Sequence, residues 1–114
     1  VLCKGQGHPR AAGTFPRALR WLREEGLSWE EALEHLTSLP ADMIWSRRGR
    51  LETGAPADLV IFDPEKLEDT ATFADQLSPP RGIRYVFVNG TLVVQNGEIL
   101  EPPQGRFLRH SEGV

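Results

Sequence analysis

The residues best suited to chemistry stand near the start of the chain, where His8, Pro9 and Arg10 follow a glycine-rich stretch. A planar guanidinium holds a carboxylate with two parallel hydrogen bonds, so Arg10 is a candidate for binding an anionic substrate. His8 carries an imidazole that titrates near neutral pH, which suits acid–base or metal chemistry. The structural alternative is a solvated loop arginine beside an ordinary surface histidine.

A metal centre built from this chain alone is not expected. His8, His35 and His110 stand far apart, without a His-x-His or a His-x-x-x-His spacing. Cys3 is the one cysteine, so it completes no zinc pattern and forms no internal disulfide. No nucleophile–base pair can be assembled from these residues either. Asp58 directly precedes an apolar run and is interpreted as a turn cap that bonds its own backbone, rather than as a catalytic acid.

The elements that must position these residues begin with helices. Thr14 is predicted to cap a first helix after a loop over residues 1–13, with Pro16 in the first turn and a glycine at the end. Ser28 and Glu31 form a capping box, which predicts a second helix over residues 29–37.

Three further segments connect to these helices or follow them. Ser38, as a cap, and Pro40 predict a third short helical turn that extends to Ile44. Residues 45–50 are interpreted as a basic, exposed connector. Residues 67–80 are interpreted as a polar connection with room for a short helical turn.

Strand signals occupy the second half of the chain. Residues 59–62 form a short apolar run that predicts a strand buried on both faces. Two runs rich in β-branched and aromatic residues, 85–88 and 92–95, flank an Asn-Gly pair at 89–90, which is typical of a type I′ hairpin turn. A second Asn-Gly turn leads to a short strand over 98–100. We expect a small antiparallel meander, and with the helices an α+β class or a junction between two architectures, which we favour.

Composition narrows the class of protein. The chain has 114 residues, 39% of them hydrophobic and 25% charged, which is ordinary for a soluble domain with one core. No apolar run approaches the ~20 residues of a membrane span. A net charge of −3 without a basic face argues against nucleic acid as a partner. The lone cysteine and the absence of a signal-peptide pattern predict a cytoplasmic protein.

Short motifs spread over most of the chain carry a family resemblance. They are His8-Pro9-Arg10, Gly13-Thr14-Phe15-Pro16-Arg17, Leu27-Ser28, Glu31-Ala32, Thr37-Ser38-Leu39-Pro40-Ala41, Gly49-Arg50-Leu51, Gly54, Ala57-Asp58-Leu59-Val60 and Val88-Asn89-Gly90. As an ensemble, from residue 8 to about residue 109, they resemble the C-terminal part of N-acyl-D-amino-acid deacylases, the D-aminoacylases of the amidohydrolase superfamily. His-Pro-Arg followed by Gly-Thr-Phe-Pro-Arg indicates the D-aminoacylase branch in particular.

The resemblance implies a division of the chain. Residues 1–48 correspond to the end of a (β/α)8 barrel, a loop followed by two or three helices. Residues 49–103 correspond to part of a small, mainly antiparallel β-sandwich that is assembled from both chain ends, and residues 104–114 to a tail. The zinc ligands and the catalytic aspartate of the family are expected upstream, so no catalytic or metal-ligating residue is assigned in this chain.

The resemblance also implies a function. The parent family are zinc-dependent hydrolases that cleave the amide bond of N-acyl-D-amino acids, and Arg10 corresponds to the arginine that binds the substrate α-carboxylate, with His8 as a second substrate-binding residue. The chain alone is expected to bind no metal and to be inactive. The alternative is a free-standing, non-catalytic binding or oligomerisation module. Such a module self-associates through an exposed barrel-facing surface, where some of Trp21, Trp29 and Trp45 are uncovered.

Overall fold

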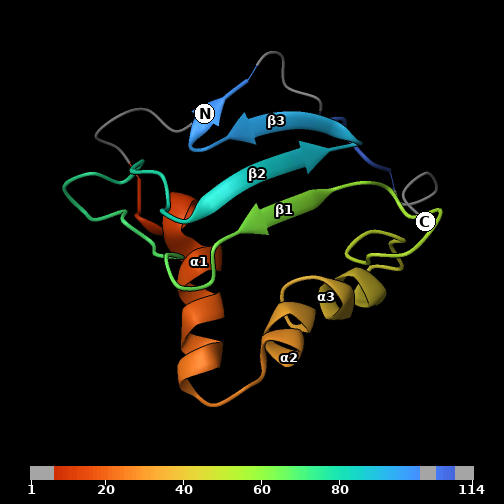
Figure 1. Cartoon of the computed structure of the whole chain (residues 1–114), viewed down its shortest axis with the longest axis horizontal. Coiled ribbons are helices and arrows are strands. Elements are labelled where there is room, and N and C mark those ends of the chain that lie inside the picture. Colours follow the sequence, from red (N-terminus) through yellow and green to blue (C-terminus); the bar gives the residue numbers. More distant parts are fainter. Residues whose placement is uncertain (1–6, 101–104, 110–114) are drawn as a thin grey trace.

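The computed structural model describes residues 7–100 and 105–109, with helices first and strands after them (Figure 1). The elements are α1 (Arg10–Glu24), α2 (Trp29–Glu34), α3 (Ser38–Met43), β1 (Leu59–Phe62), β2 (Ile83–Val88), β3 (Thr91–Gln95) and β4 (Glu98–Ile99). This content confirms the predicted α+β class. In the part of the chain that is described, no helix has the length and apolar character needed to cross a membrane.

The four strands form one antiparallel sheet in the order β1-β2-β3-β4. Asn89 and Gly90, between β2 and β3, have φ values of 50° and 80°. Asn96 and Gly97, between β3 and β4, have φ values of 49° and 85°. Positive φ at both central residues is the type I′ geometry that matches the twist of the flanking strands, so both predicted turns are confirmed.

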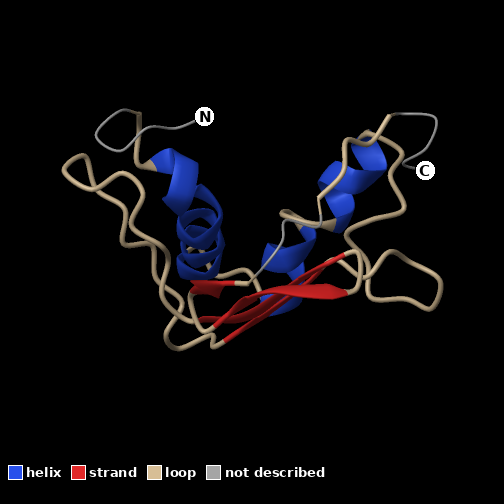
Figure 2. Ribbon diagram, turned by 90° about the horizontal axis from the view of Figure 1, so that it is seen from above, coloured by secondary structure: helices blue, strands red, loops and turns tan. Residues whose placement is uncertain are grey.

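β1 lies at one edge of the sheet, and the prediction that both of its faces are buried is wrong. Val60 is 55% exposed and Ile61 is 49% exposed. The pairing register with β2 shifts between Ile61 and Phe62, which interrupts the alternation of side chains. The helices also lie on one side of the sheet (Figure 2), so the other face of β1 has no covering layer within the described residues.

The hydrophobic core lies between the helices and the sheet. Its buried members are Leu19 of α1, Ala32 of α2 and Leu67, which follows β1. Partly buried side chains surround them: Leu22, Leu27, Trp29, Leu33, Leu36, Phe62 and Ile83. Because Leu67 belongs to the core, the connection over residues 67–80 contributes to packing. It contains a turn at residues 76–77 but no helix.

The three tryptophans are in different environments. Trp29 packs against Phe62, with 5.8 Å between the ring centroids, and the Arg23 guanidinium lies over the Trp29 ring at 4.8 Å from its centroid. Trp21 and Trp45 are exposed. The prediction that some tryptophans are left uncovered is therefore confirmed.

The second helix begins as its capping box predicts. The Ser28 hydroxyl accepts a hydrogen bond from the Glu31 amide at 3.1 Å, and the Glu31 carboxylate accepts one from the Ser28 amide at 2.8 Å. These two bonds satisfy amides that have no partner inside the helix. α2 ends at Glu34, earlier than predicted, and the following residues continue as turns.

The first helix begins earlier than predicted, so the loop expected up to Gly13 is wrong over its last residues. α1 starts at Arg10, directly after Pro9, whose φ of −52° leads into a helix. Thr14 is not a cap, because its hydroxyl donates to the Arg10 carbonyl at 2.6 Å. Pro16 accordingly lies inside α1 rather than in its first turn.

Two predictions between α2 and β1 also need correction. Thr37, not Ser38, precedes α3, and it makes no side-chain capping bond because its hydroxyl donates to the Leu33 carbonyl at 2.7 Å. The connector over residues 45–50 is not wholly exposed. The Arg48 side chain is 18% exposed, because it turns inward to an ion pair with Asp58.

Candidate functional site

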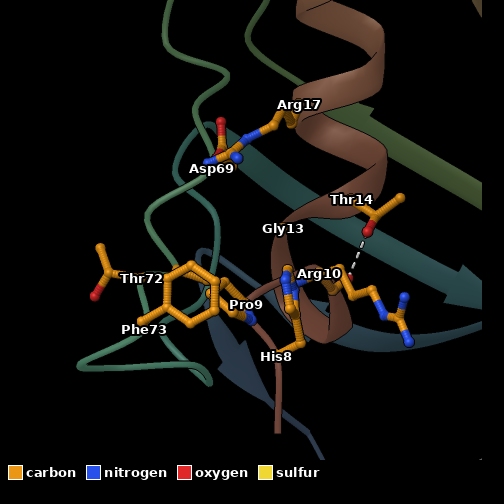
Figure 3. Close-up of a pocket in the computed structure, with 10 residues that line it drawn as sticks. His8, Pro9, Arg10, Gly13, Thr14, Arg17, Asp69, Thr72 and Phe73 are labelled. Carbon is orange, nitrogen blue, oxygen red and sulfur yellow. Dashed lines mark hydrogen bonds and ion pairs between the residues drawn. The ribbon is translucent and has the colours of Figure 1, made fainter.

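A pocket of about 300 Å³ lies where the start of α1 meets residues 69–73 (Figure 3). The helix side contributes residues from His8 to Arg17, and the facing segment contributes Asp69, Ala71, Thr72 and Phe73. The pocket therefore contains both predicted substrate-binding residues, His8 and Arg10.

His8 and Arg10 are joined by a short-range hydrogen bond. The Arg10 amide donates to His8 Nδ1 at 3.1 Å, which gives the first helical residue of α1 a partner that the helix itself cannot supply. Because Nδ1 accepts, the neutral imidazole carries its proton on Nε2. The His8 ring also meets Phe73 edge-on, with 4.9 Å between the ring centroids.

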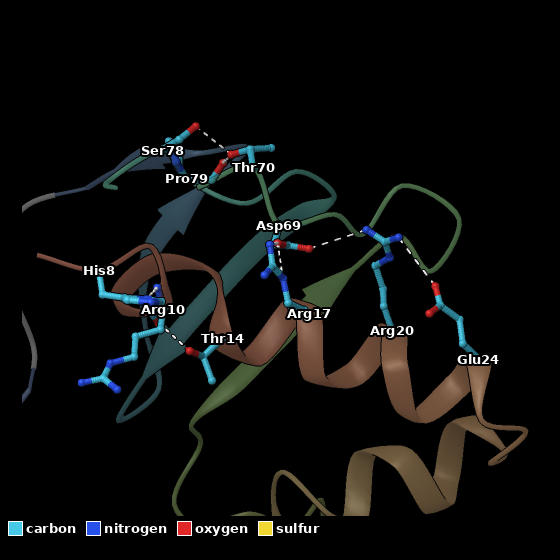
Figure 4. A network of polar contacts seen from close by, with 10 residues as sticks. All are labelled: His8, Arg10, Thr14, Arg17, Arg20, Glu24, Asp69, Thr70, Ser78 and Pro79. Atoms are coloured by element: carbon cyan, nitrogen blue, oxygen red, sulfur yellow. Dashed lines mark hydrogen bonds and ion pairs between the residues drawn. The ribbon is translucent and has the colours of Figure 1, made fainter. Parts of the chain in front are cut away.

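Three of the four arginines on α1, namely Arg10, Arg17 and Arg20, differ in how their charge is balanced (Figure 4). Arg17 donates to Asp69 Oδ2 from Nε at 2.8 Å and from Nη2 at 2.5 Å, and Arg20 lies 3.6 Å from Oδ1 of the same carboxylate. Arg20 also lies 3.7 Å from Glu24. The Asp69 side chain is 6% exposed, so this carboxylate is held almost entirely by arginine rather than by water.

Arg10 is the arginine of this group without such a partner. Its side chain is exposed and makes no hydrogen bond or ion pair within the described residues. In Figures 3 and 4 the guanidinium extends away from Asp69, and in Figure 3 it also extends away from Phe73. An exposed guanidinium without a partner among the described residues has the geometry and charge to bind an external carboxylate.

Asp58 has a structural role, as predicted, but its hydrogen-bond partners differ from the predicted ones. Its Oδ1 accepts a hydrogen bond from the Asn89 amide at 2.8 Å, and its Oδ2 pairs with Arg48. Arg48 also donates to the Asn89 side-chain oxygen at 3.1 Å. Asp58 therefore fixes the tip of the β2–β3 hairpin instead of bonding its own backbone.

Sequence reasoning did not identify Asp69 or Phe73 as parts of the site. Asp69 is 52 residues from Arg17, and no local pattern links the two. Gly13 was one available signal, because a Cβ built on it would stand 3.3 Å from the Asp69 Cβ. A helical glycine of this kind indicates that another segment approaches closely.

The comparison with known proteins establishes the class. A family model described as the amidohydrolase family matches residues 6–94. The chain belongs to the amidohydrolase family.

Within that family the resemblance to D-aminoacylases is confirmed. The chain is 42% identical over 104 residues to the D-aminoacylase of Alcaligenes xylosoxydans xylosoxydans, covering 89% of this chain and 22% of that protein. A crystal structure of a D-aminoacylase superposes with a TM-score of 0.75 at 39% identity, over 81% of this chain and 20% of the other. The chain thus spans about a fifth of the length of these relatives.

A second solved relative holds a metal and an inhibitor. The N-acyl-D-glutamate deacylase of Bordetella bronchiseptica, complexed with zinc and a phosphonate that mimics the tetrahedral intermediate, superposes with a TM-score of 0.69 at 42% identity, over 75% of this chain and 19% of that one. Its zinc agrees with the metal expected for the parent family.

The described residues of this chain do not fit a zinc centre. Across residues 7–100 and 105–109, no three side chains of His, Cys, Asp or Glu come together as metal ligands. His35 is occupied by a bond between its Nδ1 and the Glu31 carbonyl at 2.8 Å. Cys3 and His110 lie outside the described residues.

Proposed function

We propose that this chain is the substrate-carboxylate-binding part of a zinc-dependent enzyme that hydrolyses the amide bond of N-acyl-D-amino acids. The observation that carries the proposal is the difference between the α1 arginines. Arg17 and Arg20 are balanced by Asp69 and Glu24, whereas Arg10 extends away from Asp69 without a partner in the described part of the chain. The likeness to a D-aminoacylase and an N-acyl-D-glutamate deacylase supports the same assignment.

In this proposal Arg10 orients the substrate and takes no part in proton transfer. Its guanidinium donates two parallel N–H groups to the α-carboxylate, which fixes the position of the amide to be cleaved. His8 holds the Arg10 backbone by accepting its amide proton. The catalytic groups and the zinc ligands belong to residues outside this chain, so the chain alone is expected to be inactive.

We further propose that the helical part, residues 1–48, is the end of a (β/α)8 barrel, and that residues 49–103 are part of a composite sandwich. A groove of about 450 Å³ between α1, α2 and β1 supports this view. Apolar side chains line it, among them Phe15, Leu51 and Val60, and these three are exposed in the chain by itself. Large exposed apolar surfaces mark contacts with further protein.

The proposal is tested with a hybrid enzyme. Residues 8–109 of this chain replace the matching segment of the Alcaligenes D-aminoacylase, and hydrolysis of N-acetyl-D-amino acids is measured. We expect an active hybrid in which Arg10→Ala lowers kcat/KM by about 10- to 100-fold, mainly through KM, because a charged hydrogen-bonding partner is lost. Arg10→Lys is expected to restore part of the loss.

The matched control is Arg81→Ala. Arg81 is also exposed, and it pairs with Glu68 at 3.4 Å away from the pocket. Equal kinetic effects of the two substitutions would show that Arg10 has no special role. The 114-residue chain alone, assayed on the same substrates, is expected to show no hydrolysis.

The exposed apolar surface also favours a second candidate function. A free-standing module would use Phe15, Trp21 and their neighbours to self-associate, without any catalysis. Sedimentation of the 114-residue chain separates the two candidates when it is combined with the hybrid assay. A defined oligomer together with an inactive hybrid would favour the binding module over the deacylase.

A further inference from the structure

Residues 69–73 follow the first turns of α1 in the opposite direction. Three contacts join the segments: Asp69 to Arg17, Ala71 to Gly13 and Phe73 to His8. Asp69 lies beside the second turn of α1, Ala71 beside its first turn, and Phe73 beside His8, which precedes the helix.

The loop that carries Phe73 is closed at its base. The Thr70 hydroxyl donates to the Pro79 carbonyl at 2.7 Å and lies 2.7 Å from the Ser78 hydroxyl. Glu68 and Arg81 exchange backbone hydrogen bonds of 2.8 and 3.2 Å just before this point. These bonds keep the two ends of the loop together.

The backbone around Phe73 is also fixed. The Thr72 amide donates to the Asp75 carbonyl at 2.9 Å, and the Asp75 amide donates to the Thr72 hydroxyl at 3.1 Å. The Gln76 side-chain amide donates to the Phe73 carbonyl at 2.5 Å. The Phe73 ring itself is 71% exposed, so its contact with His8 is not explained by burial in a core.

His8 connects this fixed ring to the backbone of Arg10. Its imidazole meets Phe73 at an interplanar angle of 77°, which is the edge-to-face arrangement that aromatic rings prefer. The same imidazole accepts the Arg10 amide proton through Nδ1. One imidazole therefore contacts Phe73 with its ring and binds the Arg10 amide through Nδ1.

We propose that Phe73 is a positioning residue for Arg10, acting through His8 and held in place by the Asp69–Arg17 ion pair. Phe73 does not contact the substrate carboxylate in this scheme. It sets the entry of the chain into α1, and with it the direction of the Arg10 side chain. The functional consequence of this inference rests on the proposed role of Arg10. The structural consequence rests only on the contacts described above.

The structural test uses the 114-residue chain and the exchange of the Arg10 amide with water, measured by NMR. We expect Phe73→Leu to increase this exchange rate about threefold to tenfold, because an edge-to-face contact is lost. Phe73→Tyr keeps the ring and should keep the wild-type rate. Phe107→Leu is the matched control, since Phe107 is also exposed and its ring makes no aromatic contact in the described part of the chain. An unchanged rate in Phe73→Leu, or the same increase in Phe73→Tyr, would overturn the proposal.

The functional test uses the hybrid enzyme and introduces Phe73→Leu both alone and together with Arg10→Ala. We expect Phe73→Leu alone to raise KM about threefold to tenfold with kcat changed less than twofold, and to have little effect once Arg10→Ala is present. An equal effect in both backgrounds would show that Phe73 does not act through Arg10.

The two proposals fail in different ways. An inactive hybrid in which Phe73→Leu still accelerates Arg10 amide exchange would refute the deacylase function and leave the positioning contact intact. An active, Arg10-dependent hybrid in which Phe73→Leu changes neither exchange nor KM would refute the positioning role alone.

Discussion

The β2–β3 hairpin and the pocket at the start of α1 are built in different ways. The hairpin turn is determined by two adjacent residues, Asn89 and Gly90, whose positive φ values select a type I′ turn. The pocket depends on His8 and Arg17 meeting residues that are more than fifty positions away. The comparison teaches that the hairpin turns of this chain are encoded locally, whereas its candidate site exists only after distant segments have packed together.

The largest expected effect comes from a substitution at Gly82, where the start of β2 meets the segment that leads into residues 69–73. Gly82 has a φ of 84°, and a Cβ on it would stand 2.6 Å from the Lys66 carbonyl carbon and 2.7 Å from the Leu67 amide nitrogen. Gly82→Ala is expected to lower the free energy of unfolding by about 2–4 kcal/mol, because it adds a backbone clash to an unfavourable φ. Denaturant unfolding measures the change.

Gly97→Ala is the matched control for this substitution. Gly97 has a φ of 85°, but nothing lies within 4 Å of the position of its Cβ. The expected loss is about 1 kcal/mol, from the left-handed backbone alone. Equal losses of unfolding free energy at the two glycines would show that the close approach of Gly82 to Lys66 and Leu67 does not matter.

A medium effect is expected from the ion pair that anchors the pocket. Asp69→Asn should lower the free energy of unfolding by about 1–2 kcal/mol, because a nearly buried carboxylate is lost while the half-exposed Arg17 regains water. Glu68→Gln, one residue earlier, removes an exposed pair with Arg81 and should cost less than about 0.5 kcal/mol. Similar losses would mean that Asp69 is no more important than a surface charge.

The smallest effect concerns a local signal, the capping box of α2. The Ser28 amide, followed by the Ser28 hydroxyl, lowers the pKa of Glu31 below its ordinary value of 4.5. The stabilisation from this group is therefore fully present above pH 4.5, and it is lost as the pH falls from there through the lower pKa of the folded chain.

Unfolding measured across this acidic range tests the effect. Glu31→Gln is expected to make the free energy of unfolding less dependent on pH between neutral pH and the range below pH 4.5. Glu30→Gln, next to it and outside the capping box, should leave the pH profile close to that of the wild type. A Glu31→Gln profile that matches the wild type would mean that the capping box contributes no proton linkage.

The extent to which the sequence predicts the structure follows from this difference between local and distant contacts. The Asn-Gly turns and the Ser28–Glu31 box are predicted correctly, because each depends on residues a few positions apart. The predicted start of α1 is wrong, because Thr14 resembles a cap when only its neighbours are considered. In the structure α1 begins at Arg10, and the Thr14 hydroxyl bonds the Arg10 carbonyl within the helix.

The candidate site is predicted in part. Side-chain chemistry and the family resemblance single out His8 and Arg10, and both line the pocket. Asp69 and Phe73 are not predicted, because they lie in a segment without periodicity. Their importance comes from contacts with Arg17 and His8. The burial predicted for β1 is wrong for a related reason, since an apolar run does not reveal whether a second layer covers it.

The contacts between residues 69–73 and the start of α1 have a consequence for changes in chain length. Deleting one residue from this segment would shift every later side chain relative to its partner at the start of α1. All contacts beyond the deletion would then be lost together. Residues 52–54 are exposed and make no contact with this segment. The segment facing α1 should therefore tolerate side-chain substitutions more readily than insertions or deletions, and insertions should be confined to places such as residues 52–54.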